Sequence, residues 1–328
     1  MKRPGAGPLE HLVTAAESVP VDISEMLDAG LVEGARGRFS DVAQLLKARV
    51  AILVLLTAAV GFVLASRYLG AGVDVVLFCT TLLGTAALAA GAAACNQVLE
   101  RDRDALMART RGRPLPSGRI STTTATVLGG ALAIAGLIVL SLRVNPVVAV
   151  LGAITFLSYV FLYTPLKTRT HLATVIGAVP GALPPLMGWA AVSGRLDPPA
   201  WSLFGILFFW QLPHFLAIAW LYRHDYARGG FAMLTVLDPS GESTSRQVLV
   251  NSVVLLPVSL LPCAVRLSGP LYFWSALPLG LVFCGLACWM AATRSRRSAR
   301  VLLSGSILYL AFLLVALLAD RGVAWPPV

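Results

Sequence analysis

Charged side chains are scarce in this sequence. Only 13% of its 328 residues are Asp, Glu, Lys or Arg, whereas 57% are hydrophobic. About a quarter of the residues in an ordinary soluble domain are charged. The chain therefore lacks the polar surface that a water-soluble globular protein needs, and a soluble domain is excluded. The composition is typical of a protein whose surface contacts lipid.

Several motifs that define other protein classes are also missing. The five cysteines are odd in number and form no C-x-x-C string, so we expect no disulfide framework, zinc site or covalent haem attachment. The start, MKRPGAGPLEHL, has no apolar core behind its basic residues, so we expect no cleaved signal peptide. The net charge of +10 accompanies no nucleic-acid-binding motif, and no nucleic acid partner is expected.

Long apolar stretches occupy most of the chain. A helix needs about 20 residues to cross the hydrocarbon of a bilayer. The stretches lack the alternation of a strand, and only a helix satisfies its own backbone in lipid without closing a barrel. We therefore predict an all-α integral membrane protein with nine transmembrane helices. The predicted spans are Val50–Leu64, Val75–Ala94, Ala125–Leu142, Val147–Leu162, Leu172–Val192, Trp201–Leu221, Val248–Val265, Leu271–Ala292 and Val301–Ala319.

Basic residues alternate between the two ends of these spans. Of the 26 Lys and Arg residues, 21 fall in the N-terminal segment and in the connections after spans two, four, six and eight. Basic loops face the cytoplasm, so we predict a cytoplasmic N-terminus and an outward C-terminus in the inner membrane. Residues 1–45 are predicted to be a cytosolic extension with at most a short amphipathic helix at Ser24–Val32, and residues 46–328 the membrane domain.

Acidic residues follow the second span, where membrane orientation does not require them. At 100° per residue, Asn96, Glu100 and Asp104 fall on one helical face, and Asp102 points away from it. Three oxygen donors on one face suit a divalent ion such as Mg²⁺, which keeps some waters and binds phosphate oxygens. The alternative is a solvated helix end whose acids pair with the neighbouring arginines.

Two further polar strings lie on the same predicted side. Asp225 follows the sixth span and is flanked by Arg223. The string YTPLKTRT places Tyr163 and Lys167 four residues apart after the fourth span. A lysine can bind phosphate as a point charge, so this string is either part of a phosphate clamp or an anchor that fixes topology.

The interior of the spans contains few polar features. No charged residue falls in the central part of any span, which argues against an ion-coupled transporter. Span five contains GAVPGALPPLMGW, which allows a kinked or interrupted helix and also allows space for a bulky ligand. His214 lies inside span six, and its helical phase places it on one face with Asp225, roughly 16 Å away along the axis. It is either a ligand-binding residue or half of an interhelical hydrogen bond.

Several long strings between Leu45 and Gln247 resemble one family. They are LLKARV, NQVLERDRDALMARTRGRPLPSGR, YTPLKTRT, HLATVIGAVPGALPPLMGW and WQLPHFLAIAWLYRHDYARGGFAML. In this order they resemble the UbiA superfamily of intramembrane prenyltransferases, most closely its protoheme IX farnesyltransferase (heme o synthase) branch. The sequence departs from the family pattern at Glu100, where much of the superfamily has Asp, at His224, and at Gly229, where a second acid would stand.

The resemblance implies nine helices around a central cavity with cytosolic cap loops. It implies catalytic and Mg²⁺-binding roles for Asn96, Glu100, Asp104 and Asp225. Diphosphate contacts would come from Lys47, Arg113, Lys167 and Arg223, with Tyr163 beside them. We further expect His214 to contact haem as an axial ligand, because a neutral imidazole is a common ligand of iron.

The implied reaction transfers the farnesyl group of farnesyl diphosphate to a vinyl group of protoheme (heme b). Water adds to the product, which gives heme o and diphosphate. The expected partners are farnesyl diphosphate, heme b, the lipid bilayer, and a downstream heme-modifying enzyme or terminal oxidase assembly. One alternative is a UbiA-type enzyme that prenylates a quinone precursor. An alternative from another class is a nine-span transporter or a non-catalytic haem carrier.

Overall fold

The computed structural model describes residue 37 and residues 39–320. Contacts within the chain divide it into two units, Met1–Ser40 and Asp41–Val328, and all the helices below belong to the second unit. The predicted helix at Ser24–Val32 lies outside the described residues, as does most of the predicted extension 1–45. The boundary between extension and membrane domain therefore stays a prediction.

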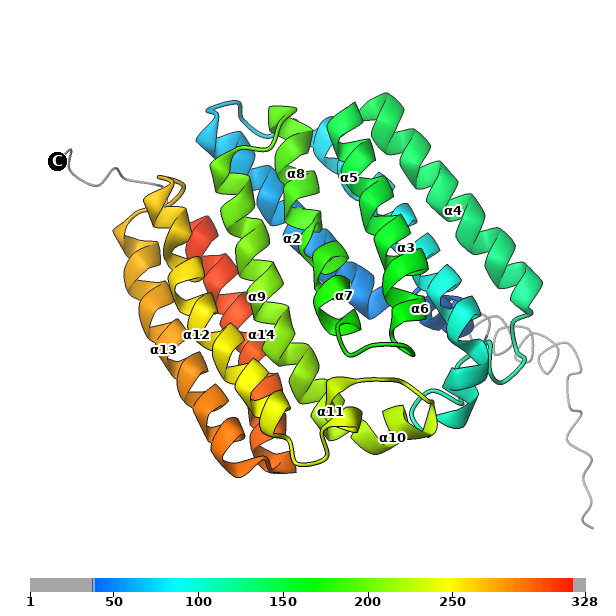
Figure 1. Cartoon of the computed structure of the whole chain (residues 1–328). Helices are drawn as coiled ribbons and strands as arrows, with labels where there is room; N and C mark the ends of the chain where they lie inside the picture. The colour runs from blue at the N-terminus through cyan, green and yellow to red at the C-terminus, as the bar shows by residue number, and fades with distance from the viewer. Residues whose placement is uncertain (1–36, 38, 321–328) are drawn as a thin grey trace, which may run out of the picture. The chain divides into compact units, whose positions relative to one another are not determined.

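Every regular element of the second unit's described part is a helix (Figure 1). In chain order the elements are α2 (Ala48–Tyr68), α3 (Val75–Leu106), α4 (Thr122–Arg143), α5 (Pro146–Leu157), the π-helix η1 (Ser158–Tyr163), α6 (Thr164–Leu166), α7 (Ala173–Ala182), α8 (Pro184–Ser193), α9 (Pro198–Leu221), α10 (Arg223–Arg228), α11 (Leu234–Leu237), α12 (Glu242–Ala264), α13 (Pro270–Thr293) and α14 (Arg296–Ala319). Nine segments of residues 39–320 are long and apolar enough to cross a membrane, which confirms the predicted nine-span fold. The protein is a multi-pass membrane protein.

Helix α9 runs between two groups of helices (Figure 1). On one side it packs against α12 and α14, and α13 lies against both of these. On the other side it contacts α7 and α8, beyond which lie α2, α3, α4 and α5. The site described below lies in this second group.

Helix α3 is longer than the predicted second span. The apolar run ends near Ala94, but the helix continues to Leu106. The added segment, CNQVLERDRDAL, contains neither Gly nor Pro, and its Leu, Glu, Arg and Gln residues are good helix formers. Asn96, Glu100 and Asp104, which the sequence places on one helical face, therefore lie on one continuous helix.

The fifth span is interrupted, as its Gly- and Pro-rich string allowed. Helix α7 ends at Ala182, and α8 begins at Pro184. Proline has no N–H to continue the hydrogen-bond ladder of a helix, but it is tolerated at the first position of a new one. Helix α8 packs closely against α2 at Gly188. Any larger residue would clash there, since a Cβ atom on Gly188 would lie only 1.9 Å from the carbonyl oxygen of Ala58. Small residues allow such backbone contact between membrane helices.

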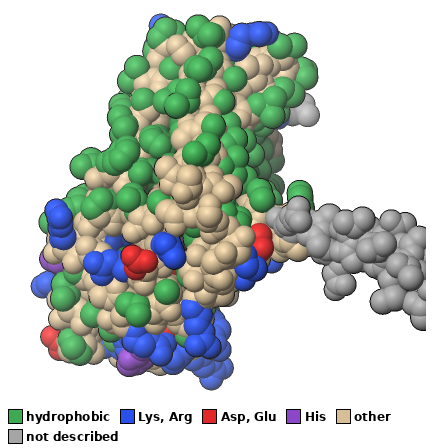
Figure 2. Space-filling view, turned by 90° about the vertical axis from the view of Figure 1, so that its right-hand side faces the viewer, with side chains coloured by type: hydrophobic (Ala, Val, Ile, Leu, Met, Phe, Trp, Pro, Cys, Tyr) green, Lys and Arg blue, Asp and Glu red, His purple; other side chains and the backbone are tan. Residues whose placement is uncertain are grey.

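The surface separates into an apolar region and a charged end. Figure 2 shows hydrophobic side chains over much of one face, with Lys and Arg gathered toward the lower end, where α10 and α11 lie in Figure 1. Large apolar side chains such as Val127 and Val315 are about two-thirds exposed, at 66% and 62%. The connections after α3, α6, α9 and α13 meet at the charged end, as the alternation of basic residues predicts (Figure 1).

Candidate functional site

A cavity of about 330 Å³ lies among α2, α3, α5 with η1, α7, α8 and α9. Apolar residues such as Val54 and Ala89 line its deep part. Its other end is lined by charged side chains from three separated segments of the chain: Lys47, Glu100, Asp104, Arg109, Arg113 and Lys167. The central cavity that the resemblance implies is therefore present, and it combines a charged end with an apolar interior.

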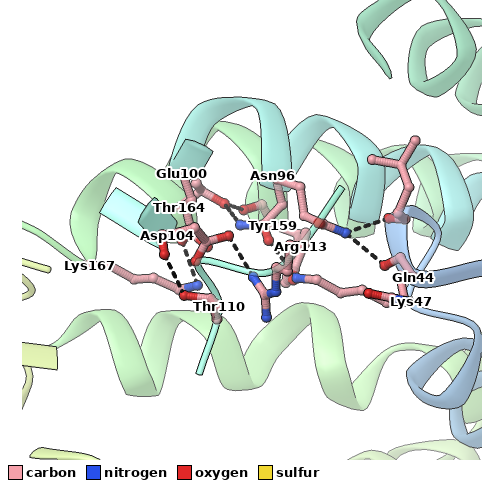
Figure 3. Close-up of polar contacts among 12 residues, drawn as sticks. Gln44, Lys47, Asn96, Glu100, Asp104, Thr110, Arg113, Tyr159, Thr164 and Lys167 are labelled. Carbon is pink, nitrogen blue, oxygen red and sulfur yellow. Dashed lines mark hydrogen bonds and ion pairs between the residues drawn. The ribbon is translucent and has the colours of Figure 1, made fainter. Parts of the chain in front are cut away.

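Helix α3 turns two carboxylates toward this cavity. Glu100 is 6% exposed and Asp104 is 1% exposed, whereas Asp102 is exposed, as the helical phase predicts. Each buried acid has a cationic partner (Figure 3). Lys167 Nζ lies 2.7 Å from Glu100 Oε1, and Arg113 Nη1 lies 2.6 Å from Asp104 Oδ2. These pairs balance charges that would be costly to bury alone.

Asn96 lies two turns before Asp104 on α3 and is fully buried. Its Oδ1 accepts a hydrogen bond from Lys47 Nζ at 2.6 Å, and its Nδ2 donates to Thr164 Oγ1 at 2.9 Å (Figure 3). The amide thus connects the start of α2 to α6. Its contact with Lys47 places a cation beside the two carboxylates.

Lys47 has an uncommon backbone conformation for a residue with a side chain. It is the N-cap of α2 and adopts left-handed angles of φ 48° and ψ 49°. Such strain persists only where the surrounding structure imposes it, and it is found often at functional sites. Burial lowers the pKa of Lys47 to about 7, although Glu100 acts in the opposite direction.

A stripe of residues spaced by four continues from α5 through η1. Thr155, Tyr159, Tyr163 and Lys167 all line the cavity. The π-helix η1 has i→i+5 hydrogen bonds, and its wide turns bring residues four apart close to one line. Lys167 Nζ lies 4.3 Å from the centroid of the Tyr163 ring. Burial opposes the charge of Lys167, but Tyr163 and Glu100 raise its pKa above the usual range, so the amine stays protonated.

These contacts define what the cavity can bind. Four cationic side chains outnumber two carboxylates at its charged end, and the remaining wall is largely apolar. An anionic head group with a hydrocarbon tail fits both parts. Tyr159 and Tyr163 add aromatic faces at the boundary, with ring centroids 5.4 Å apart.

The comparisons with known proteins agree with this description. The sequence profile of the UbiA prenyltransferase family matches residues 54–320. The chain belongs to the UbiA prenyltransferase family. It is 45% identical over 287 residues to the protoheme IX farnesyltransferase of Solibacter usitatus (strain Ellin6076), covering 86% of this chain and 98% of that protein. It is 44% identical over 283 residues to the protoheme IX farnesyltransferase of Myxococcus xanthus (strain DK1622), covering 86% and 95%.

Solved structures of other UbiA proteins have the same fold. A digeranylgeranylglyceryl phosphate synthase structure superimposes with a TM-score of 0.71 at 16% identity and covers 88% of this chain and 100% of its own. A UbiA homologue from Archaeoglobus fulgidus bound to DMAPP and Mg²⁺ superimposes with a TM-score of 0.62 at 17% identity, covering 85% and 99%. At these identities the likeness concerns the fold alone.

The aspartate of the second acidic segment of this UbiA protein lies beside the cavity, whereas its neighbour Tyr226 lines the wall. Asp225 is 9% exposed, pairs with Arg228 and does not line the cavity. Its hydrogen bond with Arg228 lowers the pKa of Asp225. Within residues 39–320, no three His, Cys, Asp or Glu side chains are grouped so that they could hold a metal ion. The Mg²⁺-binding role of Asp225 therefore stays a prediction.

Of the two arginines expected at the site, Arg113 lines the cavity and Arg223 does not. Arg223 stacks on Trp220, with its guanidinium carbon 4.5 Å from the ring centroid, and does not line the cavity. Arg109 lines the cavity instead and lies 4.8 Å from the ring centroid of Tyr226. Arg109 is one of the arginines near the α3 acids that were expected only to pair with those acids. The basic string RTRGR, which begins at Arg109 soon after Asp104, was the sequence feature that could have indicated a place for Arg109 in the site.

His214 lies on the flank of α9 that faces α14 and does not line the cavity. Its Nδ1 lies 2.7 Å from Ser306 Oγ, so the interhelical hydrogen bond that the sequence left open is present. The predicted alignment of His214 with Asp225 on one helix face is wrong. Helix α9 ends at Leu221, and Tyr222, with φ −110° and ψ 21°, separates it from α10.

Proposed function

We propose that this chain transfers the farnesyl group of farnesyl diphosphate to a vinyl group of protoheme, with addition of water, and forms heme o and diphosphate. The observation that carries the proposal is the charged end above an apolar cavity, which suits a prenyl diphosphate. The acceptor is inferred from the two relatives named protoheme IX farnesyltransferase, which are 44–45% identical over nearly their whole length.

The diphosphate would lie at the charged end of the cavity. Lys47, Arg109, Arg113 and Lys167 present cationic groups there from three separated segments of the chain. Cations held in place before the reaction stabilise the negative charge that develops when the C1–O bond of the substrate breaks. The farnesyl chain would extend along the apolar wall toward Ala89, where the absence of charged groups limits early capture of the cation by water.

Mg²⁺ fits the residues present. Mg²⁺ binds proteins through one or two carboxylates and completes its shell with waters and substrate phosphates. Glu100 and Asp104 are two such carboxylates, and both line the cavity from one face of α3. Asn96, the third predicted ligand, does not line the cavity, and its amide oxygen accepts a hydrogen bond from Lys47, so its direct contact with the ion stays a prediction. When bound, the ion would neutralise charge on the leaving diphosphate. Asp225 would also act by ordering the segment after α3, because the backbone of Ala108 in that segment contributes to lowering the pKa of Asp225.

The chain's own aromatic residues would assist the allylic cation. The rings of Tyr159 and Tyr163 line the cavity next to the charged end. An aromatic face attracts a nearby cation by about 0.5–2 kcal/mol. Neither hydroxyl is required as a nucleophile, since the vinyl group of the acceptor attacks C1.

His214 is proposed as the haem ligand through Nε2. Ser306 Oγ donates to the carbonyl of Leu303 at 2.7 Å, so we assign the proton of the His214–Ser306 hydrogen bond to Nδ1. Nε2 then has a free lone pair. Histidines that bind metals commonly donate their other ring N–H to a neighbouring oxygen, as His214 does here.

The charged end of the protein is proposed to face the cytoplasm, in agreement with the positive-inside rule. This orientation gives a cytoplasmic N-terminus and an outward C-terminus in the inner membrane. Farnesyl diphosphate would then enter from the cytoplasm. Heme o would pass to a downstream heme-modifying enzyme or terminal oxidase assembly.

The test is to measure diphosphate release by the purified protein with farnesyl diphosphate, Mg²⁺ and one acceptor at a time. We expect release that depends on haem and does not occur with an aromatic quinone precursor. Release with the quinone precursor alone would favour the other UbiA-type reaction. No release with either acceptor would favour a transporter or a haem carrier.

A further inference from the structure

Gln211 is a buried polar residue in the middle of a membrane span. It lies on α9 between Trp210 and Leu212, is 3% exposed, and lines the cavity. Its Nε2 donates a hydrogen bond to the carbonyl oxygen of Ala178 on α7 at 2.6 Å. This bond fixes the amide plane, so the position of the side-chain oxygen Oε1 is also fixed. A polar side chain at membrane depth is a candidate functional residue by default.

Two glycines of α7 give the depth of Gln211 in the cavity. A Cβ atom on Gly177 would lie 2.5 Å from the ring of Tyr163, and one on Gly181 would lie 2.2 Å from Gln211 Oε1. Gly177 and Gly181 are one turn apart, about 6 Å along the helix. Tyr163 contacts Lys167 at the charged end. Gln211 Oε1 therefore lies one helical turn deeper than the layer proposed to hold the diphosphate.

The backbone beside Gln211 contributes hydrogen-bond acceptors. Pro180 and Gly181 line the cavity, and the residues four positions later are Pro184 and Pro185. Proline has no N–H, so neither carbonyl receives its α-helical hydrogen bond. The layer below the diphosphate thus has acceptors without net charge. Such a layer suits a neutral molecule that carries hydrogen-bond donors, and water is the neutral donor that the proposed reaction requires.

We infer that Gln211 Oε1 accepts a hydrogen bond from the water molecule that completes the reaction, and so positions its oxygen. The inference rests on the proposed function. When the vinyl group attacks C1 of the farnesyl chain, the C1–O bond breaks and the inner vinyl carbon becomes cationic. The water oxygen forms a bond to that carbon and gives up one proton to the released diphosphate. If no water is in position, the cation loses a proton from an adjacent carbon and forms an alkene lighter by one water.

Four variants test the inference through the ratio of alkene to alcohol on the product haem, measured by mass spectrometry. Gln211→Met keeps the size of the side chain but removes the acceptor. Gln211→Glu keeps the acceptor, because a carboxyl that stays neutral in this apolar setting has one O–H that can donate to Ala178 and one carbonyl oxygen that can accept from water. Gly181→Ala displaces Oε1 without changing Gln211. Gly130→Ala on α4 is the matched control, because a Cβ atom there meets nothing within 4 Å.

We expect Gln211→Met and Gly181→Ala to raise the ratio of alkene to alcohol at least about tenfold. Gln211→Glu and Gly130→Ala should keep the ratio of the unmodified protein. An equal fall of both products in Gln211→Met, with the ratio unchanged, would show a packing role and overturn the inference. If the unmodified protein forms neither product from haem and farnesyl diphosphate, the proposed function itself is wrong and the inference falls with it.

Discussion

Asp104→Asn tests the assignment of the α3 face most sharply. The change keeps the shape of the side chain and removes one negative charge that is 1% exposed and lines the cavity. A carboxylate such as Asp104 and a unit positive charge about 4 Å away attract each other by about 4 kcal/mol at an effective dielectric constant of 20. Arg113 loses its partner in this variant, so its guanidinium can bind the diphosphate instead and offset part of the lost attraction. We therefore expect a loss of about 2 kcal/mol of transition-state stabilisation, or roughly thirtyfold in kcat/KM.

The folded state should tolerate this change. The side chain of Arg113 is 27% exposed, so its charge remains partly hydrated when the ion pair is lost. The matched control is Asp102→Asn, the same substitution two residues earlier on the exposed side of α3. Both variants are purified, their thermal unfolding is compared, and initial rates are measured at saturating haem. If Asp102→Asn reduced kcat/KM as strongly as Asp104→Asn, the assignment of the α3 face would be refuted.

Three further predictions follow from the same contacts. Glu100→Gln should lower stability by about 3–5 kcal/mol because it leaves Lys167 buried without its partner, and thermal unfolding should show recovery in the double variant with Lys167→Met. The KM for farnesyl diphosphate should rise roughly fivefold from pH 7 to pH 8, because Lys47, with a pKa of about 7, is about half protonated at pH 7 and mostly deprotonated at pH 8; Lys47→Arg should flatten the profile. His214→Ala should weaken haem binding and change the haem absorption spectrum without altering farnesyl diphosphate affinity, and an unchanged spectrum would remove His214 as a ligand.

Local patterns in the sequence predicted much of the architecture. The length of the apolar runs predicted nine spans, and the four-residue spacing of Asn96, Glu100 and Asp104 predicted that they share a face. The prolines at positions 184 and 185 indicated a break in span five. Each of these features depends on residues close together in the chain, so helical geometry alone was sufficient.

The pairing of side chains within the site could not be predicted in this way. Lys167 meets Glu100 across 67 positions of sequence, and Gln211 meets Ala178 across 33. Such contacts depend on how helices pack, which residue spacing does not specify. The error at His214 has a local cause: its phase was extended through Tyr222 as if α9 continued, and the backbone changes direction there.

The mass of the haem product tests the central claim most directly. The purified protein is incubated with haem, farnesyl diphosphate and Mg²⁺. The porphyrin is then extracted, and its molecular mass is measured by mass spectrometry. We expect haem that has gained one farnesyl group and one hydroxyl group, with a parallel reaction of Asp104→Asn giving far less of it. Recovery of unmodified haem, with farnesyl diphosphate either intact or merely hydrolysed to farnesol, would contradict it.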